Sequence, residues 1–152
     1  MSNPFFTLQQ RVHDLIAAQS YFVALAPNQI LTEQVADLDN RIQTVLLQLG
    51  FGIVVMTAEG VPATSADFGV VVSLERLTVS IVHNPTLDMT HNALDALDAV
   101  RQAVIGQSVQ PTPPDADKAW DYFGYAGHQR RMDSLPELNV HELHITAGLR
   151  LQ

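Results

Sequence analysis

The feature that most constrains the fold is a long strand that breaks into a helix between Phe68 and Gly106. The segment reads FGVVVSLERLTVSIVHNPTLDMTHNALDALDAVRQAVIG. β-Branched residues dominate its first half, which predicts a β-strand that ends at Asn84-Pro85. In the second half, apolar residues recur at helical spacing, at Leu94, Leu97, Val100 and Val104. We expect the rest of the chain to pack against this strand–helix pair.

The apolar positions of the predicted strand change phase near its middle. Two sets of residues lie in opposite registers: Val70, Val72 and Leu74 in the first, and Leu77, Val79 and Ile81 in the second. Because side chains alternate with period two along a strand, this shift predicts a β-bulge or a strong bend around Glu75 and Arg76. A tight hairpin is the alternative, although the site lacks the Gly or Asn that hairpin turns favour.

Two helices are predicted before this strand. Asn3 and Pro4 favour the start of the first helix, because proline at the first helical position loses no hydrogen bond, and the helix should end by residues 26–28. The second helix has Thr32 as its predicted N-cap and Gly50 as a left-handed terminator. The predicted apolar stripes are Leu8, Val12, Leu15, Ile16 and Phe22 in the first helix, and Val35, Leu38, Ile42, Val45, Leu46 and Leu49 in the second.

The remaining segments complete a pattern of strands and one long loop. Residues 51–58 are predicted to form a buried strand and residues 59–67 a loop. Residues 107–117 are a Pro-rich connector, and residues 120–125 are an aromatic segment that residues 127–134 continue as a strand. Residues 140–151 are a half-buried strand with alternating apolar positions. The order α-α-β-β-α-β-β predicts a single α+β domain over residues 1–152, with a mainly antiparallel four-stranded sheet and helices packed on one face.

Composition limits the functions that the chain can have. Charged residues make up 16% of the sequence, below the globular average of about 25%, so surface is either hidden between subunits or rich in uncharged polar residues. The net charge of −8 opposes binding to nucleic acid, and the absence of cysteine excludes disulfides and thiolate sites. We expect no secretory signal and no membrane span, because no apolar run approaches about 20 residues.

Three sets of polar residues were considered as chemical sites. His141 and His144 lie three apart on a predicted strand and therefore point to opposite faces, which argues against a shared metal ion. His83 and His91 flank the strand-to-helix turn with Asp88 between them, and remain a minor possibility for a site. Asp95 and Asp98 could share a helix face, but a solvated face is the stronger interpretation. The sequence therefore predicts no catalytic, cofactor-binding or metal-binding residues.

Aromatic residues cluster directly after the Pro-rich connector, at Trp120, Tyr122, Phe123 and Tyr125. Such a cluster is typical either of a core strand or of a contact between proteins, since Tyr and Trp often anchor interfaces. We consider the core interpretation first and retain these four residues as a candidate subunit interface.

The overall pattern resembles the tail terminator and related small tail-completion proteins of long-tailed bacteriophages. The segments that carry the resemblance are two N-terminal helices, the strand LERLTVSIVHNP, the helix LDMTHNALDALDAVRQAV, a Pro-rich gap and the closing strand NVHELHITAGLRL. The resemblance implies a structural protein, not an enzyme, whose subunits form a ring, typically a hexamer. Such a ring caps the tail tube, ends tail polymerisation and joins the tail to the head or neck.

The resemblance also implies partners and a location. The partners are other copies of the chain, the tail tube protein and a head or neck connector protein, with no cofactor and no sequence-specific nucleic acid. The protein would be found in the host cytoplasm during assembly and then in the virion tail. Two alternatives remain open: a small α/β enzyme or ligand-binding domain that uses His83, His91 or the aromatic cluster, and a head-completion or neck adaptor protein.

Overall fold

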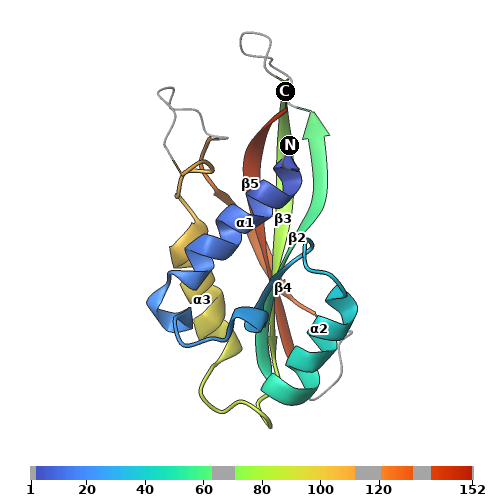
Figure 1. The fold of residues 1–152 in the computed structure, drawn as a ribbon. Coiled ribbons are helices and arrows are strands. Elements are labelled where there is room, and N and C mark those ends of the chain that lie inside the picture. Colours follow the sequence, from blue (N-terminus) through green and yellow to red (C-terminus); the bar gives the residue numbers. More distant parts are fainter. Residues whose placement is uncertain (1–2, 63–70, 112–120, 132–137, 152) are drawn as a thin grey trace.

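The strand β3 (Val71–His83) lies at the centre of a five-stranded sheet in the computed structural model, which describes residues 3–62, 71–111, 121–131 and 138–151 (Figure 1). It pairs antiparallel with β2 (Phe51–Pro62) on one side and with β5 (Asn139–Leu151) on the other. The sheet order is β1-β2-β3-β5-β4, where β4 spans Gly124–Arg130 and pairs antiparallel with β5.

The sheet is mainly antiparallel as predicted, but the prediction of four strands is wrong, because a fifth strand lies parallel to its neighbour. This strand, β1 (Ile30–Thr32), pairs in parallel with residues 53–55 of β2. Its three residues are all buried. Thr32 therefore lies in a strand and is not the predicted helix cap, and a three-residue strand is too short for periodicity to reveal.

The first helix, α1 (Pro4–Ala17), begins as predicted. The side chain of Asn3 accepts hydrogen bonds from the backbone N–H groups of Phe5 and Phe6, which caps the helix. The helix ends at Ala17, earlier than expected, and two short 3-10 turns follow, η1 (Ser20–Phe22) and η2 (Pro27–Gln29). Phe22 is buried as expected, but it enters the core from η1.

The second helix starts later than predicted. α2 spans Leu38–Thr44 and continues into a π-helical turn, η3 (Val45–Leu49). Asp37, with φ of 62°, stands at its N-cap in place of Thr32. Gly50 has φ of 78°, so its predicted role as a left-handed terminator is confirmed.

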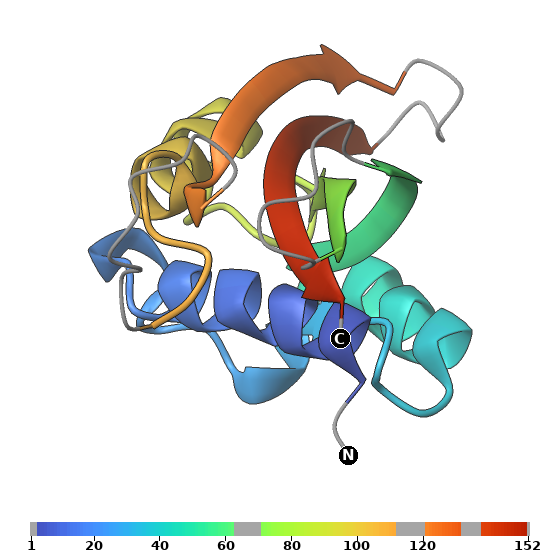
Figure 2. The ribbon, with the colours of Figure 1, turned by 90° about the horizontal axis from the view of Figure 1, so that it is seen from above.

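Helices cover both faces of the sheet, not one face as predicted. α1 and α3 (Ala93–Val104) pack on the face that carries Ile53 and Val55, whereas α2 and η3 pack on the opposite face over Val54. The cause is the run Ile53-Val54-Val55, which is apolar on both faces of β2 and therefore needs cover on both. Figure 2 shows the twisted strands from above, with α1 and α3 beside them.

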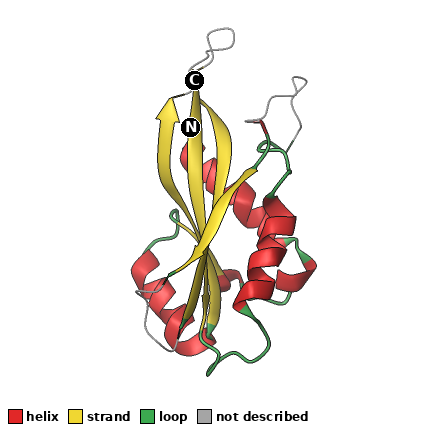
Figure 3. Cartoon of the chain, turned by 180° about the vertical axis from the view of Figure 1, so that it is seen from behind, coloured by secondary structure: helices red, strands yellow, loops and turns green. Residues whose placement is uncertain are grey.

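The register shift of the sheet lies in β2 and not in β3. β3 pairs with β5 without interruption from Val71 to His83, so the predicted bulge around Glu75 and Arg76 is wrong. The irregularity falls between Thr57 and Glu59 of β2, opposite that part of β3. β2 also extends to Pro62, four residues beyond its predicted end. Figures 1 and 3 show β2, β3 and β5 extending past α2 and α3 toward the end where both termini lie.

The strand-to-helix break after His83 is confirmed, with one change in the helix face. Leu97, Val100 and Val104 of α3 are buried as predicted, but Leu94 is 60% exposed. Gly106, with φ of 85°, follows the helix closely. β5 confirms the predicted C-terminal strand. Within the described ranges, no helix is long and apolar enough to cross a membrane.

Candidate functional site

The loop between β3 and α3 holds a polar cluster centred on Asp88, which is 8% exposed. Its Oδ1 accepts hydrogen bonds from the backbone N–H groups of Thr90 (2.7 Å) and His91 (3.1 Å) and from the Thr90 hydroxyl (2.9 Å). Its Oδ2 accepts a hydrogen bond from Nδ1 of His91 at 2.6 Å. An Asp side chain that accepts from the backbone two residues later forms an Asx-turn, so one carboxylate holds the loop in shape.

His83 joins this cluster from the end of β3. Its Nε2 lies 2.9 Å from the carbonyl oxygen of Asp88, and because a carbonyl only accepts, Nε2 carries the proton. Both histidine rings contact the ring of Phe51. The His91 ring stacks on it with ring centroids 4.3 Å apart, and the His83 ring packs edge-on with ring centroids 6.0 Å apart. The three residues that the sequence offered as a minor candidate site are therefore brought together, and they order the loop.

The protonation state of Asp88 is fixed by its hydrogen bonds. Burial raises the pKa of this carboxyl, but the hydrogen bonds from the His91 ring and from Thr90 outweigh burial and lower its pKa to about 2. Asp88 is thus a carboxylate near neutral pH and a poor proton donor. In the part of the chain that the structure describes, no group of three His, Cys, Asp or Glu residues is arranged to hold a metal ion.

The other predicted pairs do not converge. His141 and His144 both lie on β5, and residues three apart on a strand point to opposite faces. Burial lowers the pKa of His141 and of His144, and a nearby arginine adds to the effect in each case. Oδ1 of Asp98 forms an ion pair with Nη2 of Arg101 at 2.6 Å. The exposed carboxylate of Asp95 has no ion pair within the described ranges.

The four aromatic residues of the candidate interface have different environments. Trp120 lies outside the described residues. Phe123 is 1% exposed and belongs to the main core, while Tyr122 is half-buried and forms an isolated bridge with Ser108. Tyr125 on β4 is 50% exposed. Among the described members, Tyr125 is thus the one most accessible to a partner.

Large apolar side chains are exposed around the Asp88 loop. Leu87, Met89 and Leu94 are 48%, 92% and 60% exposed, and we call these three residues the turn patch. Leu87 and Met89 lie directly on either side of Asp88 in the sequence, so the hydrogen bonds of Asp88 fix the backbone that presents them. This surface was not predicted, because the helical spacing of the sequence places Leu94 in the core. The run Asp88-Met89-Thr90-His91 could have indicated this exposed turn, since an Asp side chain often bonds the backbone two residues later in an Asx-turn.

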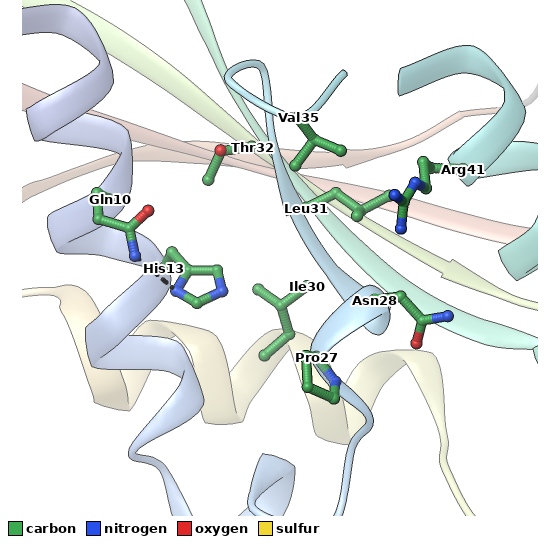
Figure 4. A pocket seen from close by; sticks show the side chains of 9 residues that line it. All are labelled: Gln10, His13, Pro27, Asn28, Ile30, Leu31, Thr32, Val35 and Arg41. Atoms are coloured by element: carbon green, nitrogen blue, oxygen red, sulfur yellow. Dashed lines mark hydrogen bonds between the residues drawn. The ribbon is translucent and has the colours of Figure 1, made fainter. Parts of the chain in front are cut away.

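A shallow groove of about 270 Å³ lies at the outer strand of the sheet, between α1 and α2 (Figure 4). Pro27, Ile30, Leu31 and Val35 supply its apolar wall, and we call it the β1 groove. In Figure 4, His13 and Gln10 from α1 lie on one side and Arg41 from α2 lies on the other. Its polar groups therefore do not converge on one point, unlike those of a typical ligand site.

A larger groove of about 710 Å³ lies between α1, residues 109–111 and the end of β5. Gly148 and Leu149 line it from β5, and Phe6, Leu8 and Arg11 line it from α1. Arg11 crosses it by donating a hydrogen bond to the carbonyl oxygen of Ser108. This groove carries no cluster of titratable groups with shifted pKa values, so nothing in it indicates catalysis.

The sequence matches no known protein-family model and no curated protein. Its fold is similar to that of a chain from a solved structure described as the virion of a native gene transfer agent particle. The two chains share 15% sequence identity, the match covers 95% of each chain, and the TM-score is 0.60. The likeness therefore extends over nearly the whole of both chains, and at this identity it establishes a shared fold.

Proposed function

We propose that this protein is a structural component of a phage-type particle. In this proposal its copies form a ring that caps the tail tube, ends tail polymerisation and joins the tube to the head or neck. The observation that carries the proposal is the fold shared over 95% of both chains with a protein of a gene transfer agent virion. The pattern of strands and helices that resembles tail terminators points in the same direction.

The surface of the protein supports a role in assembly. The three side chains of the turn patch stand in water in the isolated chain, and exposed apolar patches of this kind commonly mark contacts between proteins. Tyr125 on β4 adds an exposed aromatic residue of the type that anchors interfaces. The described grooves instead lack the convergent polar groups that a catalytic site requires.

A ring of this kind would act by presenting two different faces. One face binds the last ring of tube subunits, and the other offers no surface to which a further tube subunit can add. Polymerisation then stops because the growing end is covered, without any chemical step. The second face is left free for a connector protein of the head or neck.

The proposal is tested by polymerising purified tail tube protein from the same particle with and without this protein, and imaging the products by negative-stain electron microscopy. We expect shorter tubes that carry one ring at a single end, with the length falling as the ratio of this protein to tube protein rises. Unchanged tube lengths with no ring at the ends would contradict the proposal. Binding to a connector protein but not to tubes would instead favour a neck adaptor.

A further inference from the structure

We propose that the turn patch of one copy docks into the β1 groove of a second copy, so that neighbouring subunits join head to tail. The inference rests on the proposed function, because it specifies which surfaces meet when copies assemble. It is carried by three observations: a rigid exposed apolar turn, an exposed apolar groove, and opposite charges beside them.

The turn patch is ordered before any partner arrives. Asp88 binds Thr90 and His91 through four hydrogen bonds of 2.6 to 3.1 Å, and Tyr21 adds its hydroxyl, which accepts from the backbone N–H of Asn92 at 3.0 Å. Met89 is 92% exposed although its neighbour Asp88 is buried. Docking this turn therefore orders few additional groups, which lowers the entropic cost of association.

The β1 groove offers an apolar surface of matching character. Pro27 is exposed and Val35 is half-buried, and these two residues supply its accessible apolar surface. Ile30 and Leu31 also line the groove but are only 6% and 2% exposed. β1 is the outermost strand on its side of the sheet and has only three residues. The groove is thus open at the edge of the molecule, where a neighbouring subunit can reach it.

Charges beside the two surfaces are complementary. Asp95 is the neighbour of Leu94, and its exposed carboxylate has no ion pair within the described ranges. Arg41 lines the β1 groove, is exposed, and likewise has no ion pair there. A contact between the two surfaces brings a carboxylate toward a guanidinium, which favours this orientation over others.

The two surfaces share no residue. The groove lies at β1, at one edge of the sheet, whereas α3, which carries Leu94 and Asp95, packs against β3 and β5. A contact between two different surfaces is heterologous, and it produces a ring when the rotation between subunits closes. This is the geometry that a tube cap needs.

The first test is the variant Met89→Asp in the full-length protein, measured by sedimentation equilibrium over a wide concentration range. We expect wild-type protein to form species larger than a dimer and Met89→Asp to associate roughly 100-fold more weakly, because a central apolar contact is replaced by a charge. Leu47→Asp is the matched control, since Leu47 is 72% exposed but belongs to neither surface. It should assemble like the wild type.

The second test reverses the charges. Asp95→Arg and Arg41→Glu should each weaken assembly roughly 10-fold when studied alone. In an equimolar mixture, each contact between unlike variants pairs either the two original residues or the two reversed ones, so assembly in which the two variants alternate should recover. Circular dichroism of each variant confirms that the fold is retained. No recovery in the mixture would overturn the pairing.

Three outcomes would overturn the inference. These are a wild-type protein that remains monomeric at every concentration, an assembly limited to dimers, and a Met89→Asp variant that assembles as well as Leu47→Asp. If Met89→Asp forms normal rings but no longer caps tubes, the turn patch contacts the tube protein instead of a second copy. The tube-length assay on wild-type protein judges the proposed function separately, so capping without this contact would leave that function standing.

Discussion

Two buried acidic side chains, Asp88 and Glu75, differ in how many hydrogen bonds the fold provides to their carboxyl oxygens. Both are nearly inaccessible, with 8% and 3% of their surface exposed. Both oxygens of Asp88 accept hydrogen bonds, and the pKa of the group is lowered to about 2. The Oε2 atom of Glu75 has no hydrogen-bond partner in the part of the chain that the structure describes.

The difference follows from what surrounds each side chain. Asp88 lies in a loop, whose free backbone N–H groups turn toward the carboxylate. Glu75 lies in the middle of the sheet, where Gly60 and Ala147 are its partners on the adjacent strands, and the N–H groups of paired strands largely bond to each other. A loop can therefore supply hydrogen bonds to a buried carboxyl oxygen that a sheet leaves without a partner, and the free energy of unfolding should change in opposite directions when the two residues are substituted.

The largest expected effect is on the loop. Asp88→Ala removes the acceptor for Thr90 and His91, and we expect the free energy of unfolding to fall by about 3 kcal/mol. Asp88→Asn keeps one acceptor oxygen and should cost less. Chemical denaturation with urea measures both. A loss in Asp88→Ala no larger than about 0.5 kcal/mol, the usual range for surface substitutions, would show that the hydrogen bonds do not stabilise the loop.

One glycine lies beside each carboxylate, and the cost of replacing it with alanine should also differ between the two sites. A Cβ atom at Gly50 would lie 2.9 Å from the backbone nitrogen of Asp88, and Gly50 has φ of 78°. Gly50→Ala should therefore cost about 2 to 3 kcal/mol through backbone strain and displacement of the loop. At Gly60 the nearest atom is the end of the flexible Glu75 side chain, so Gly60→Ala should cost less. Thermal unfolding of the two variants checks this order, and an equal or reversed cost would contradict it.

The pH dependence of stability should report on Asp88. The folded pKa of about 2 lies below the ordinary value of 3.8 for an Asp carboxyl group, so the stabilisation is complete above about pH 5 and is lost as the pH falls through 4 toward 2. The shift corresponds to about 2 kcal/mol of unfolding free energy. Unfolding curves between pH 6 and 2 measure it, with Asp88→Asn as the control that lacks this titration. A parallel pH dependence in the two proteins would rule out Asp88 as its source.

The fold was predictable where local signals and burial agree. Asn3 caps α1, Gly50 terminates the second helical segment, and the alternation of Leu143 and Ile145 identified β5. Each of these rests on interactions within a few residues, which the sequence contains directly. Topology was less accessible: whether β2 is covered on both faces depends on where α2 packs, and that is decided by distant parts of the chain.

The surfaces were harder to predict than the core. The helical pattern placed Leu94 inward with Leu97, but the buried face of α3 begins with Ala93 in the same turn, and Leu94, one residue later, points away from it. The β1 groove depends on a three-residue strand and on Arg41 of a different element. Candidate contact surfaces combine residues that are separated in the sequence, so no single stretch revealed them.

The smallest expected effect has the opposite sign and concerns Glu75. Glu75→Gln replaces a buried carboxyl group whose Oε2 lacks a partner with an uncharged amide of the same shape, so we expect the free energy of unfolding to rise by about 1 kcal/mol. The same change of acid to amide at Asp88 should destabilise the protein, so Glu75→Gln and Asp88→Asn together test whether the two sites differ. Urea denaturation at neutral pH measures both variants side by side. If Glu75→Gln also destabilises the protein, the fold favours an acid over an amide at both sites, and the contrast between them is wrong.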